Sequence, residues 1–299
     1  MRILVTGAGG MLGTDLLATL SGNHELFGVD LKSPANKVPE VAYHVLDITN
    51  TKDTYERITK INPELVIHTA AFTDVDGAES KPELAFQANA IGTRNVALSC
   101  QRFDATMIYI SSDYVFDGNK TTPYVEYDQP NPLSSYAQSK YWGELYTLGL
   151  LNKFMIIRSS WLFGRNGRNF VQAFLSQVKS QHKLRVVNDQ VGSPTYTLDL
   201  AGAIKELISM QEKVGTGLYG IWHITNSGHC SWYDMAQEIL KQVKNQTGIE
   251  AISTAQLDRP ALRPKNSVLD NFNWRLQNFA SLPPWQDALR RFLRESGEI

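Results

Sequence analysis

Short apolar runs alternate with stretches of helical periodicity along the first half of the chain. Residues 2–6 are rich in branched apolar side chains, a glycine cluster follows, and residues 11–20 then place apolar side chains every three or four positions. These features predict a strand, a tight turn and a helix. The same alternation predicts strands at 25–29, 65–68, 106–110 and 154–157, a short strand ending at Leu46, and helices at 51–61, 84–102 and 134–150.

Strands and helices that alternate in this way are typical of α/β proteins. Successive right-handed βαβ units place helices on both faces of a parallel sheet, so we predict a doubly wound parallel sheet over residues 1–160. After Arg158 the pattern loosens, and glycine and proline separate shorter elements. We predict that residues 161–299 form mainly a smaller C-terminal α/β lobe, with approximate boundaries and with strands that the main sheet can share. Its expected elements are helices at 170–180, 197–208, 232–244 and 285–294 and a strand at 184–187.

The composition is that of an ordinary globular protein, with 42% hydrophobic and 20% charged residues in 299. A formal net charge of -1 with interspersed signs offers no electrostatic footprint for nucleic acid or an anionic membrane. The N-terminal segment reaches glycines after too few apolar residues for a signal-peptide core, and no stretch has the length of a membrane span, so we expect a cytoplasmic protein. Cys100 and Cys230 flank no metal-ligand spacing, which predicts buried thiols and no metal site.

Gly7, Gly10 and Gly13 stand where the first predicted strand passes into the first predicted helix. Glycines at these places permit a sharp turn, let backbone N–H groups approach a pyrophosphate, and allow close packing of helix and strand. The helix N-terminus also favours negative charge. We therefore interpret residues 7–13 as a dinucleotide-binding loop and residues 1–160 as a dinucleotide-binding domain; a glycine-rich turn without a ligand is the alternative.

Asp30 closes the second predicted strand, near the place where a carboxylate meets the ribose hydroxyls of an adenosine. A carboxylate there repels a 2′-phosphate and favours NADH, whereas Lys32 can pair with that phosphate and favours NADPH. Both cofactors therefore stay open. Asp47 and Ile48 follow the next short strand and are expected beside the adenine; the alternative is that Asp47 caps the helix that follows.

Ser112 follows the predicted strand at 106–110, and Tyr136 and Lys140 lie four positions apart on the next predicted helix. The carboxyl ends of parallel strands face the crevice where doubly wound sheets bind ligands, so Ser112 is expected on the cofactor side. Residues four apart share one helix face, so the phenol and the ammonium can act on one object. Taken alone, the pair also fits the solvent-facing side of an ordinary helix. Glu144, one turn further, is expected behind the site or in solvent.

The dinucleotide loop, the strand-end serine and the Tyr-x-x-x-Lys pair, in this order, resemble the extended short-chain dehydrogenase/reductase superfamily. Within it, the chain resembles the dTDP-4-dehydrorhamnose reductase family over most of its length. The glycine loop and the Tyr/Lys pair mark only the superfamily, whereas other stretches are more specific to the reductases. The specific stretches are Ala70-Ala71-Phe72-Thr73-Asp74-Val75-Asp76, Ser111-Ser112-Asp113-Tyr114-Val115-Phe116 and Asp189-Gln190-Val191-Gly192-Ser193-Pro194-Thr195.

The resemblance implies a Rossmann-like fold and reduction of the 4-keto group of dTDP-4-dehydro-L-rhamnose, with NADPH or NADH as hydride donor. The product, dTDP-L-rhamnose, is a nucleotide sugar of polysaccharide biosynthesis. The family mechanism implies that Tyr136 delivers a proton to the forming alkoxide, while Lys140 lowers the pKa of the tyrosine and holds the nicotinamide ribose. Ser112 stands where the family usually has threonine, and its hydroxyl keeps the ability to polarise the carbonyl.

The resemblance extends to residues around the reacting groups. On the cofactor side it adds Met11, Leu12, Ala70 and Ala71. On the substrate side it adds Asp113, Trp161 and Asn169, and the guanidinium of Arg263 suits a nucleotide diphosphate. Three of these residues have a structural alternative. Asp113 can cap the following turn, Trp161 can belong to the core, and Arg263 can lie in a solvated basic loop.

Two other functions stay open on the same scaffold. Dehydratases of the superfamily have Thr-Asp-Glu at the strand end, and this chain lacks the glutamate, but an epimerase needs only a retained cofactor and a rotating keto intermediate. A regulatory protein like the β subunit of methionine adenosyltransferase binds a dinucleotide without catalysis, and the intact Ser112, Tyr136 and Lys140 disfavour that reading. The expected partner is a nucleotide sugar, and the sequence is compatible with a homodimer.

Overall fold

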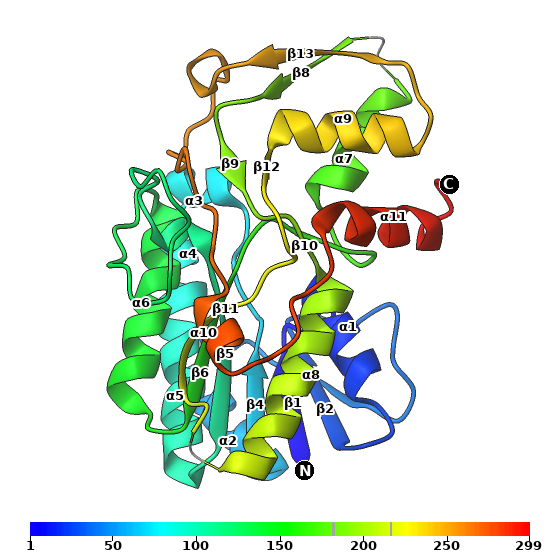
Figure 1. The fold of residues 1–299 in the computed structure, drawn as a ribbon. Coiled ribbons are helices and arrows are strands. Elements are labelled where there is room, and N and C mark those ends of the chain that lie inside the picture. The colour runs from blue at the N-terminus through cyan, green and yellow to red at the C-terminus, as the bar shows by residue number, and fades with distance from the viewer. Residues whose placement is uncertain (181–182, 216) are drawn as a thin grey trace.

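A seven-stranded sheet forms the centre of the computed structural model, which describes residues 1–180, 183–215 and 217–299 (Figure 1). The strand order is β11-β6-β5-β4-β1-β2-β3, and every neighbouring pair is parallel. The chain winds outward from β1 in both directions, so the predicted doubly wound parallel sheet is confirmed. The strands are β1 (Arg2–Thr6), β2 (Glu25–Asp30), β3 (Ala42–Val45), β4 (Leu65–His68), β5 (Thr106–Ser112), β6 (Phe154–Ser159) and β11 (Gly220–His223).

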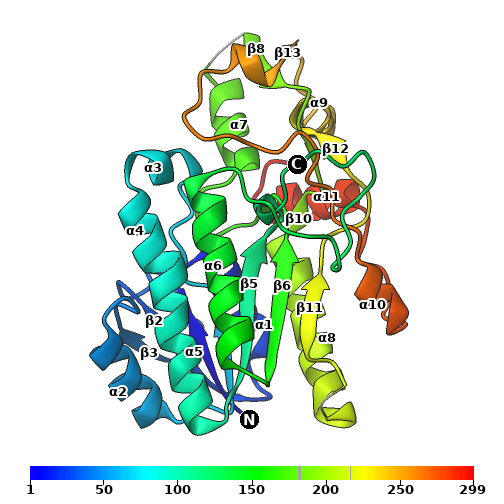
Figure 2. The same ribbon diagram turned by 90° about the vertical axis from the view of Figure 1, so that its left-hand side faces the viewer.

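Helices cover both faces of this sheet (Figures 1 and 2). On one face α1 (Met11–Leu20) packs beside α8 (Thr197–Val214), and on the other lie α2 (Thr51–Ile61), α5 (Gly92–Phe103) and α6 (Ser135–Leu150). Strands covered on both sides are buried throughout, as all four residues of β4 are, which explains why they read as continuous apolar runs. The Ser134 side chain accepts a hydrogen bond from Ala137 N and so fixes the start of α6.

The helix predicted at 84–102 consists of three successive segments. These are α4 (Pro82–Phe86), a π-helical turn (Gln87–Ile91) and α5, and a short helix that the periodicity did not predict, α3 (Val75–Ser80), precedes them. The π-helical turn buries Asn89 and often marks functional positions in helices. Periodicity cannot reveal such a turn, because one extra residue leaves the apolar spacing on either side nearly unchanged.

A smaller body lies over the carboxyl ends of the central strands (Figure 1). Helices α7 (Phe170–Val178), α9 (Trp232–Gln242) and α11 (Trp285–Glu295) enclose a hydrophobic core of their own. Short strand pairs complete it: β7 (Leu162–Phe163) with β10 (Thr195–Tyr196), β8 (Lys183–Val187) with β13 (Gly248–Ile252), and β9 (Val191–Gly192) with β12 (Cys230–Ser231). All of these elements come from the part of the chain after residue 160.

The chain after residue 160 also returns to the central sheet. β11 pairs with β6, α8 packs on α1, and α10 (Phe272–Leu276) lies against β11. The segments 1–160 and 161–299 therefore share one sheet. Cys100 and Cys230 are both buried, as expected, and carry free thiols. Within the described residues no helix combines the length and apolar character needed to cross a membrane.

Candidate active site

The glycine loop joins β1 to α1 at the carboxyl edge of the sheet. Gly7 has φ = 68°, and a Cβ there would lie 2.7 Å from the Ala70 nitrogen, so only glycine fits. A Cβ on Gly13 would lie 2.9 Å from the Gly7 carbonyl carbon, because helix and loop pack closely. Gly10 precedes α1, and no side chain in the described residues caps that helix. Its first N–H groups are therefore not occupied by a side-chain cap, and the loop fits a dinucleotide pyrophosphate.

Asp30 ends β2 and is tied to this loop. Its Oδ2 accepts a hydrogen bond from Gly9 N at 2.9 Å, and its Oδ1 accepts one from Leu31 N at 2.7 Å. Each carboxylate oxygen keeps a second lone pair, so hydrogen bonds from ribose hydroxyls remain feasible. Lys32 is exposed two residues further. The two side chains with opposite effects on cofactor choice thus lie at the same edge.

The remaining cofactor-side candidates line the neighbouring strand ends. Asp47 is exposed, and its Oδ1 accepts hydrogen bonds from the Thr49 N–H and hydroxyl, while Asn50 rather than Asp47 caps α2. Ile48 is buried against α5. Ala70 and Ala71 are half-buried directly after β4, and Ala70 abuts the glycine loop. Met11 and Leu12 form the first turn of α1, with Leu12 buried.

Ser112 is the last residue of β5, and Tyr136 lies in the first turn of α6. Burial raises the pKa of Tyr136 to about 12, and the nearby Ser112 side chain acts in the opposite direction. The Ser112 hydroxyl also donates to Asp113 Oδ1 at 3.1 Å and accepts from Tyr114 N at 3.2 Å. The phenol is therefore protonated at neutral pH and stands beside a fixed hydroxyl.

Lys140 lies one turn after Tyr136 and is buried. Its Nζ donates a hydrogen bond to the Ile110 carbonyl oxygen at 2.6 Å and lies 4.3 Å from the centroid of the Tyr109 ring. Burial lowers the pKa of Lys140 to about 7, although the Glu144 carboxylate raises it. A buried ammonium excludes the alternative that this pair occupies the solvent-facing side of an ordinary helix.

Asn89, in the π-helical turn, connects the loop after β4 with α6. Its Oδ1 accepts a hydrogen bond from Phe72 N at 2.7 Å, and its Nδ2 donates to Phe72 O at 3.0 Å and to Ser139 Oγ at 2.9 Å. Ser139 in turn donates to the carbonyl oxygen of Tyr136 at 2.7 Å. This buried network fixes the first turn of α6, on which Tyr136 lies.

Asp113 is buried beside Ser112 and bonds to serines of the lobe side. Its Oδ2 accepts a hydrogen bond from Ser160 Oγ at 3.0 Å, and Ser267 also bonds to it. Burial raises the pKa of Asp113 to about 6 against the effect of these serines. The following 3-10 turn is capped by Ser112, so the structure disagrees with the alternative in which Asp113 is the cap.

Trp161 follows β6 and faces the lobe. Its φ of 46° is a strained conformation for a bulky residue, and such strain concentrates at functional sites. Its ring stacks on Trp232, with centroids 3.4 Å apart and an interplanar angle of 4°. A Cβ on Gly192 would overlap the same indole. Trp161 is half-buried, so it is not a fully enclosed core residue.

Asn169 and Arg263 already have protein partners. Asn169 caps α7 by accepting from Gln172 N at 3.1 Å, and its Nδ2 donates to Gly164 O at 2.8 Å. Arg263 Nη2 donates to Asp76 Oδ2 at 2.9 Å. Arg263 also lies near Tyr114, whose ring packs edge-on against that of Tyr136. The Arg263 guanidinium is therefore held by Asp76 on the Tyr114 side of Tyr136 rather than free in a solvated loop.

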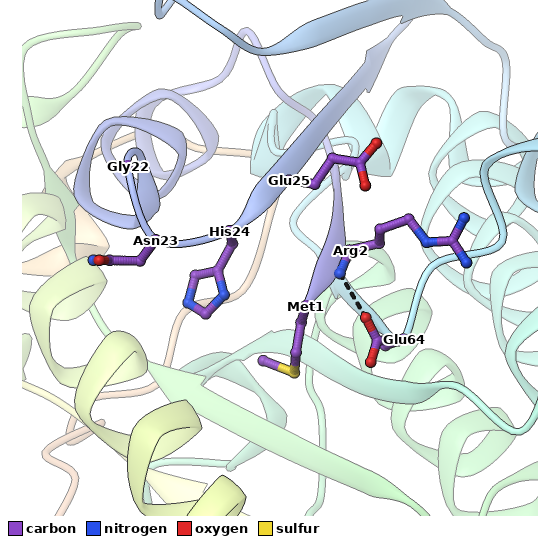
Figure 3. A pocket seen from close by; sticks show the side chains of 7 residues that line it. All are labelled: Met1, Arg2, Gly22, Asn23, His24, Glu25 and Glu64. Atoms are coloured by element: carbon purple, nitrogen blue, oxygen red, sulfur yellow. Dashed lines mark hydrogen bonds between the residues drawn. The ribbon is translucent and has the colours of Figure 1, made fainter.

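Two depressions in the described surface lie away from these residues. The larger, of about 610 Å³, opens at the amino ends of β1 and β2, where Arg2 N donates to Glu64 Oε2 at 2.8 Å (Figure 3). The smaller, of about 210 Å³, lies between the segment after β11 and α10. Ligands of doubly wound sheets bind at the carboxyl end of the strands, which excludes the larger depression as the active site. The smaller depression is lined by none of Ser112, Tyr136 and Lys140.

The family model described as RmlD substrate binding domain matches residues 1–297. The chain is also 37% identical over 302 residues to the dTDP-4-dehydrorhamnose reductase of Aggregatibacter actinomycetemcomitans, a match that covers 97% of each chain. The chain belongs to the dTDP-4-dehydrorhamnose reductase family. The family resemblance seen in the sequence motifs is thereby confirmed.

Other proteins are similar to this chain along nearly their whole length. The spore coat polysaccharide biosynthesis protein SpsK of Bacillus subtilis is 36% identical over 98% of this chain and 97% of its own. A crystal structure of dTDP-4-dehydrorhamnose reductase from Bacillus anthracis in complex with NADP superposes with a TM-score of 0.86 at 37% identity, over 98% of this chain and 99% of that chain. The Rossmann-like fold is thus shared across the family.

Two features of this reductase-family site were not predicted from the sequence. Glu144 forms a buried ion pair with Arg158, where the sequence left it behind the site or in solvent. Trp232 stacks on Trp161 from a helix start 71 positions later in the chain. The spacing of Glu144 from Lys140 placed both on one helix face, but no local signal could show that this face is buried against β6.

Proposed function

We propose that the chain reduces the 4-keto group of dTDP-4-dehydro-L-rhamnose to give dTDP-L-rhamnose, using NADPH or NADH. The observation that carries the proposal is the meeting of Ser112, Tyr136 and Lys140 at the carboxyl edge of β5, on the same side as the glycine loop. Family membership supports the reaction class, because a relative that spans the whole chain is named for this reduction.

The cofactor site is built from the glycine loop and the strand ends beside it. Gly7, Gly10 and Gly13, with Met11 and Leu12, would hold the pyrophosphate at the start of α1. Asp30 and Lys32 would meet the adenosine ribose, Asp47 and Ile48 the adenine, and Ala70 and Ala71 the middle of the dinucleotide. The bound nicotinamide supplies the hydride.

Tyr136 acts as the proton donor in this proposal. Its pKa of about 12 keeps the phenol protonated before the reaction, which is the form a general acid needs. The Ser112 hydroxyl, fixed between Asp113 and Tyr114 N, would polarise the keto oxygen and set its distance from Tyr136. These two hydroxyls together define one position for the reacting oxygen.

In this proposal Lys140 stabilises the phenolate that forms when Tyr136 gives up its proton. Its ammonium lies one helical turn away, and an adjacent positive charge lowers the cost of forming the phenolate. The bond from Nζ to the Ile110 carbonyl oxygen limits the orientations that the ammonium can adopt. We expect the same group to hold the nicotinamide ribose.

The substrate residues are proposed from the family resemblance and from their surroundings. Asp113 would contact the sugar, and Trp161 would form an apolar wall beside it. Tyr114 lies between Arg263 and Tyr136, and we propose that Arg263 binds the diphosphate of the substrate. To do so, its guanidinium would bind the phosphate either in addition to Asp76 or in its place. The Asn169 amide oxygen and nitrogen both already have protein partners, so Asn169 would support substrate binding by fixing the start of α7.

A panel of nucleotide-linked 4-keto sugars tests the reaction, with NADH and NADPH oxidation as the readout. Net oxidation with the dTDP-linked 4-keto-6-deoxyhexose supports the proposal and gives the cofactor preference. A protein that keeps tightly bound NAD and never oxidises added cofactor would instead be an epimerase. A protein that binds the dinucleotide and turns over no sugar would be regulatory.

Tyr136→Phe tests the proton donor. We expect turnover to fall by about 10²–10⁴-fold while cofactor affinity stays near that of the wild type, because the change removes a proton donor and little volume. Tyr146→Phe, on the same helix, is the matched control and should leave turnover unchanged. Full activity in Tyr136→Phe would remove Tyr136 from the mechanism. Size-exclusion chromatography of the wild-type protein shows whether it forms the homodimer with which the sequence is compatible.

A further inference from the structure

A buried ion pair lies one helical turn beyond Lys140. Arg158 Nε donates to Glu144 Oε1 at 2.9 Å, and Arg158 Nη2 donates to Glu144 Oε2 at 2.7 Å, so the pair is bidentate. Ser111 Oγ donates to Glu144 Oε1 at 2.5 Å. The Glu144 side chain is 0% exposed and that of Arg158 is 2% exposed. The proposed mechanism gives this cluster no role.

The fold brings the three side chains together from separate elements. Ser111 on β5 and Arg158 on β6 are directly opposite each other in the sheet register. Helix α6 packs along both strands (Figure 2), and Glu144 follows Lys140 by four residues, on the same helix face. The cluster therefore lies one helical turn beyond Lys140, on the same face of α6.

Stability alone is a weak reason for such a pair. Removing two charges from water is costly, and apolar side chains of similar volume often hold a core equally well. Arg158 is bound through Nε and Nη2 to Glu144 and lies over the Phe116 ring, with its guanidinium carbon 5.1 Å from the ring centroid. The charges of the pair are thus held in fixed positions beside Lys140.

The other groups that face Lys140 carry no negative charge at neutral pH. Tyr136 on α6 and Tyr109 on β5 are phenols whose pKa values burial raises. His68 on β4 is neutral, because burial and the nearby Lys140 lower its pKa to about 3. Among the described residues, Glu144 is the charge that acts on Lys140 and opposes the effect of burial. Asp113, beyond Ser112, bonds to serines.

We propose that Glu144 is a positioning residue that keeps the Lys140 ammonium charged inside the protein, with Arg158 and Ser111 holding its carboxylate in place. The inference rests on the proposed function for its catalytic meaning, since only the charged lysine can stabilise the Tyr136 phenolate. It predicts that the negative charge of Glu144, and not its shape, governs the protonation of Lys140.

An NMR titration of Lys140 tests this directly. Protein labelled with ¹³C-lysine is titrated with pH, and the Lys140 signal is assigned by its loss in Lys140→Met. Glu144→Gln keeps the shape and removes the charge, and we expect it to lower the Lys140 midpoint by about one pH unit or more. Glu144→Asp keeps the charge and should stay closer to the wild type than Glu144→Gln. Glu83→Gln, an exposed carboxylate on α4, is the matched control and should change nothing.

An unchanged midpoint in Glu144→Gln would overturn the proposal, and so would a larger shift in Glu144→Asp than in Glu144→Gln. If Glu144→Gln fails to fold because Arg158 is left unpaired, Glu144→Gln combined with Arg158→Gln removes both charges. The midpoint should fall in that double variant too, because Glu144 rather than Arg158 acts on Lys140.

The pH profile of kcat/KM provides the functional readout. Lys140 must stay charged, so the alkaline limb should move to lower pH in Glu144→Gln and stay in place in Glu83→Gln. If the chain reduces no keto-sugar nucleotide, the proposed function fails and the Lys140 titration still decides the role of Glu144. If the chain is an active reductase with an unmoved Lys140 midpoint, only this inference fails.

Discussion

Replacing Gly13 by alanine adds one methyl group at the point where α1 packs on the glycine loop. The new Cβ would lie 2.9 Å from the Gly7 carbonyl carbon, 3.1 Å from the Ala8 Cα, and still closer to the Gly7 carbonyl oxygen. These are backbone atoms, which cannot move aside as a flexible side chain can. Gly7 itself packs closely against the Ala70 backbone, which limits how far it can shift. The helix and the loop must therefore separate.

The contact with the Gly7 carbonyl oxygen needs a displacement of about 1.5 Å, because non-bonded heavy atoms settle at about 3.5–4.0 Å. Overpacking of this kind costs about 1–3 kcal/mol. If the cost appears in the free energy of unfolding, Tm should fall by about 2–4 °C for each kcal/mol. If it appears at the pyrophosphate site instead, each 1.4 kcal/mol weakens dinucleotide binding about tenfold.

Thermal unfolding and a fluorescence titration with NADPH and NADH measure both effects. Gly202→Ala is the matched control: it lies in α8, nothing lies within 4 Å of its Cβ, and alanine should stabilise the helix by about 1 kcal/mol. A Gly13→Ala protein that unfolds and binds dinucleotide like the wild type would refute the argument that glycine is required there for close packing.

Two further variants concern proposed substrate residues: Arg263→Gln tests binding of the nucleotide sugar, and Asp113→Asn tests how burial of a carboxylate affects stability. Arg263→Gln should raise KM for the nucleotide sugar by about tenfold or more at nearly constant kcat, because a charge-assisted hydrogen bond contributes about 1.5–3 kcal/mol; an unchanged KM would confine Arg263 to its bond with Asp76. Burial raises the pKa of Asp113 from 3.8 to about 6, so the folded protein binds this proton more tightly than the unfolded chain. As pH rises from about 4 to about 6, Asp113 therefore lowers the free energy of unfolding, and the loss reaches about 3 kcal/mol once the carboxyl group is ionised in both states. Asp113→Asn should gain stability relative to the wild type between about pH 4 and pH 7 in thermal unfolding, and a constant difference would contradict this.

The sequence by itself determined the order of the elements and the class of the fold. The strand at 65–68 and the helix at 51–61 have the predicted bounds, because apolar periodicity and capping residues such as Asn50 act over a few positions. The glycine loop could be predicted for the same reason, because its three glycines lie in a turn and a helix start that a few neighbouring residues determine. Ser112, Tyr136 and Lys140 could be placed on one side because strand ends and helix faces follow from local geometry.

Only the tertiary structure decided how those side chains behave. The burial of Lys140, and with it a pKa of about 7, depends on β5 beneath α6 and not on any neighbour in sequence. The bond between Asp76 and Arg263 joins residues 187 positions apart. The sequence left Glu144 either behind the site or in solvent, because its helix pattern does not say which surface covers it. The structure pairs it with Arg158 on β6. Charge pairing and desolvation are set by which elements meet, so they become visible only once the chain has folded.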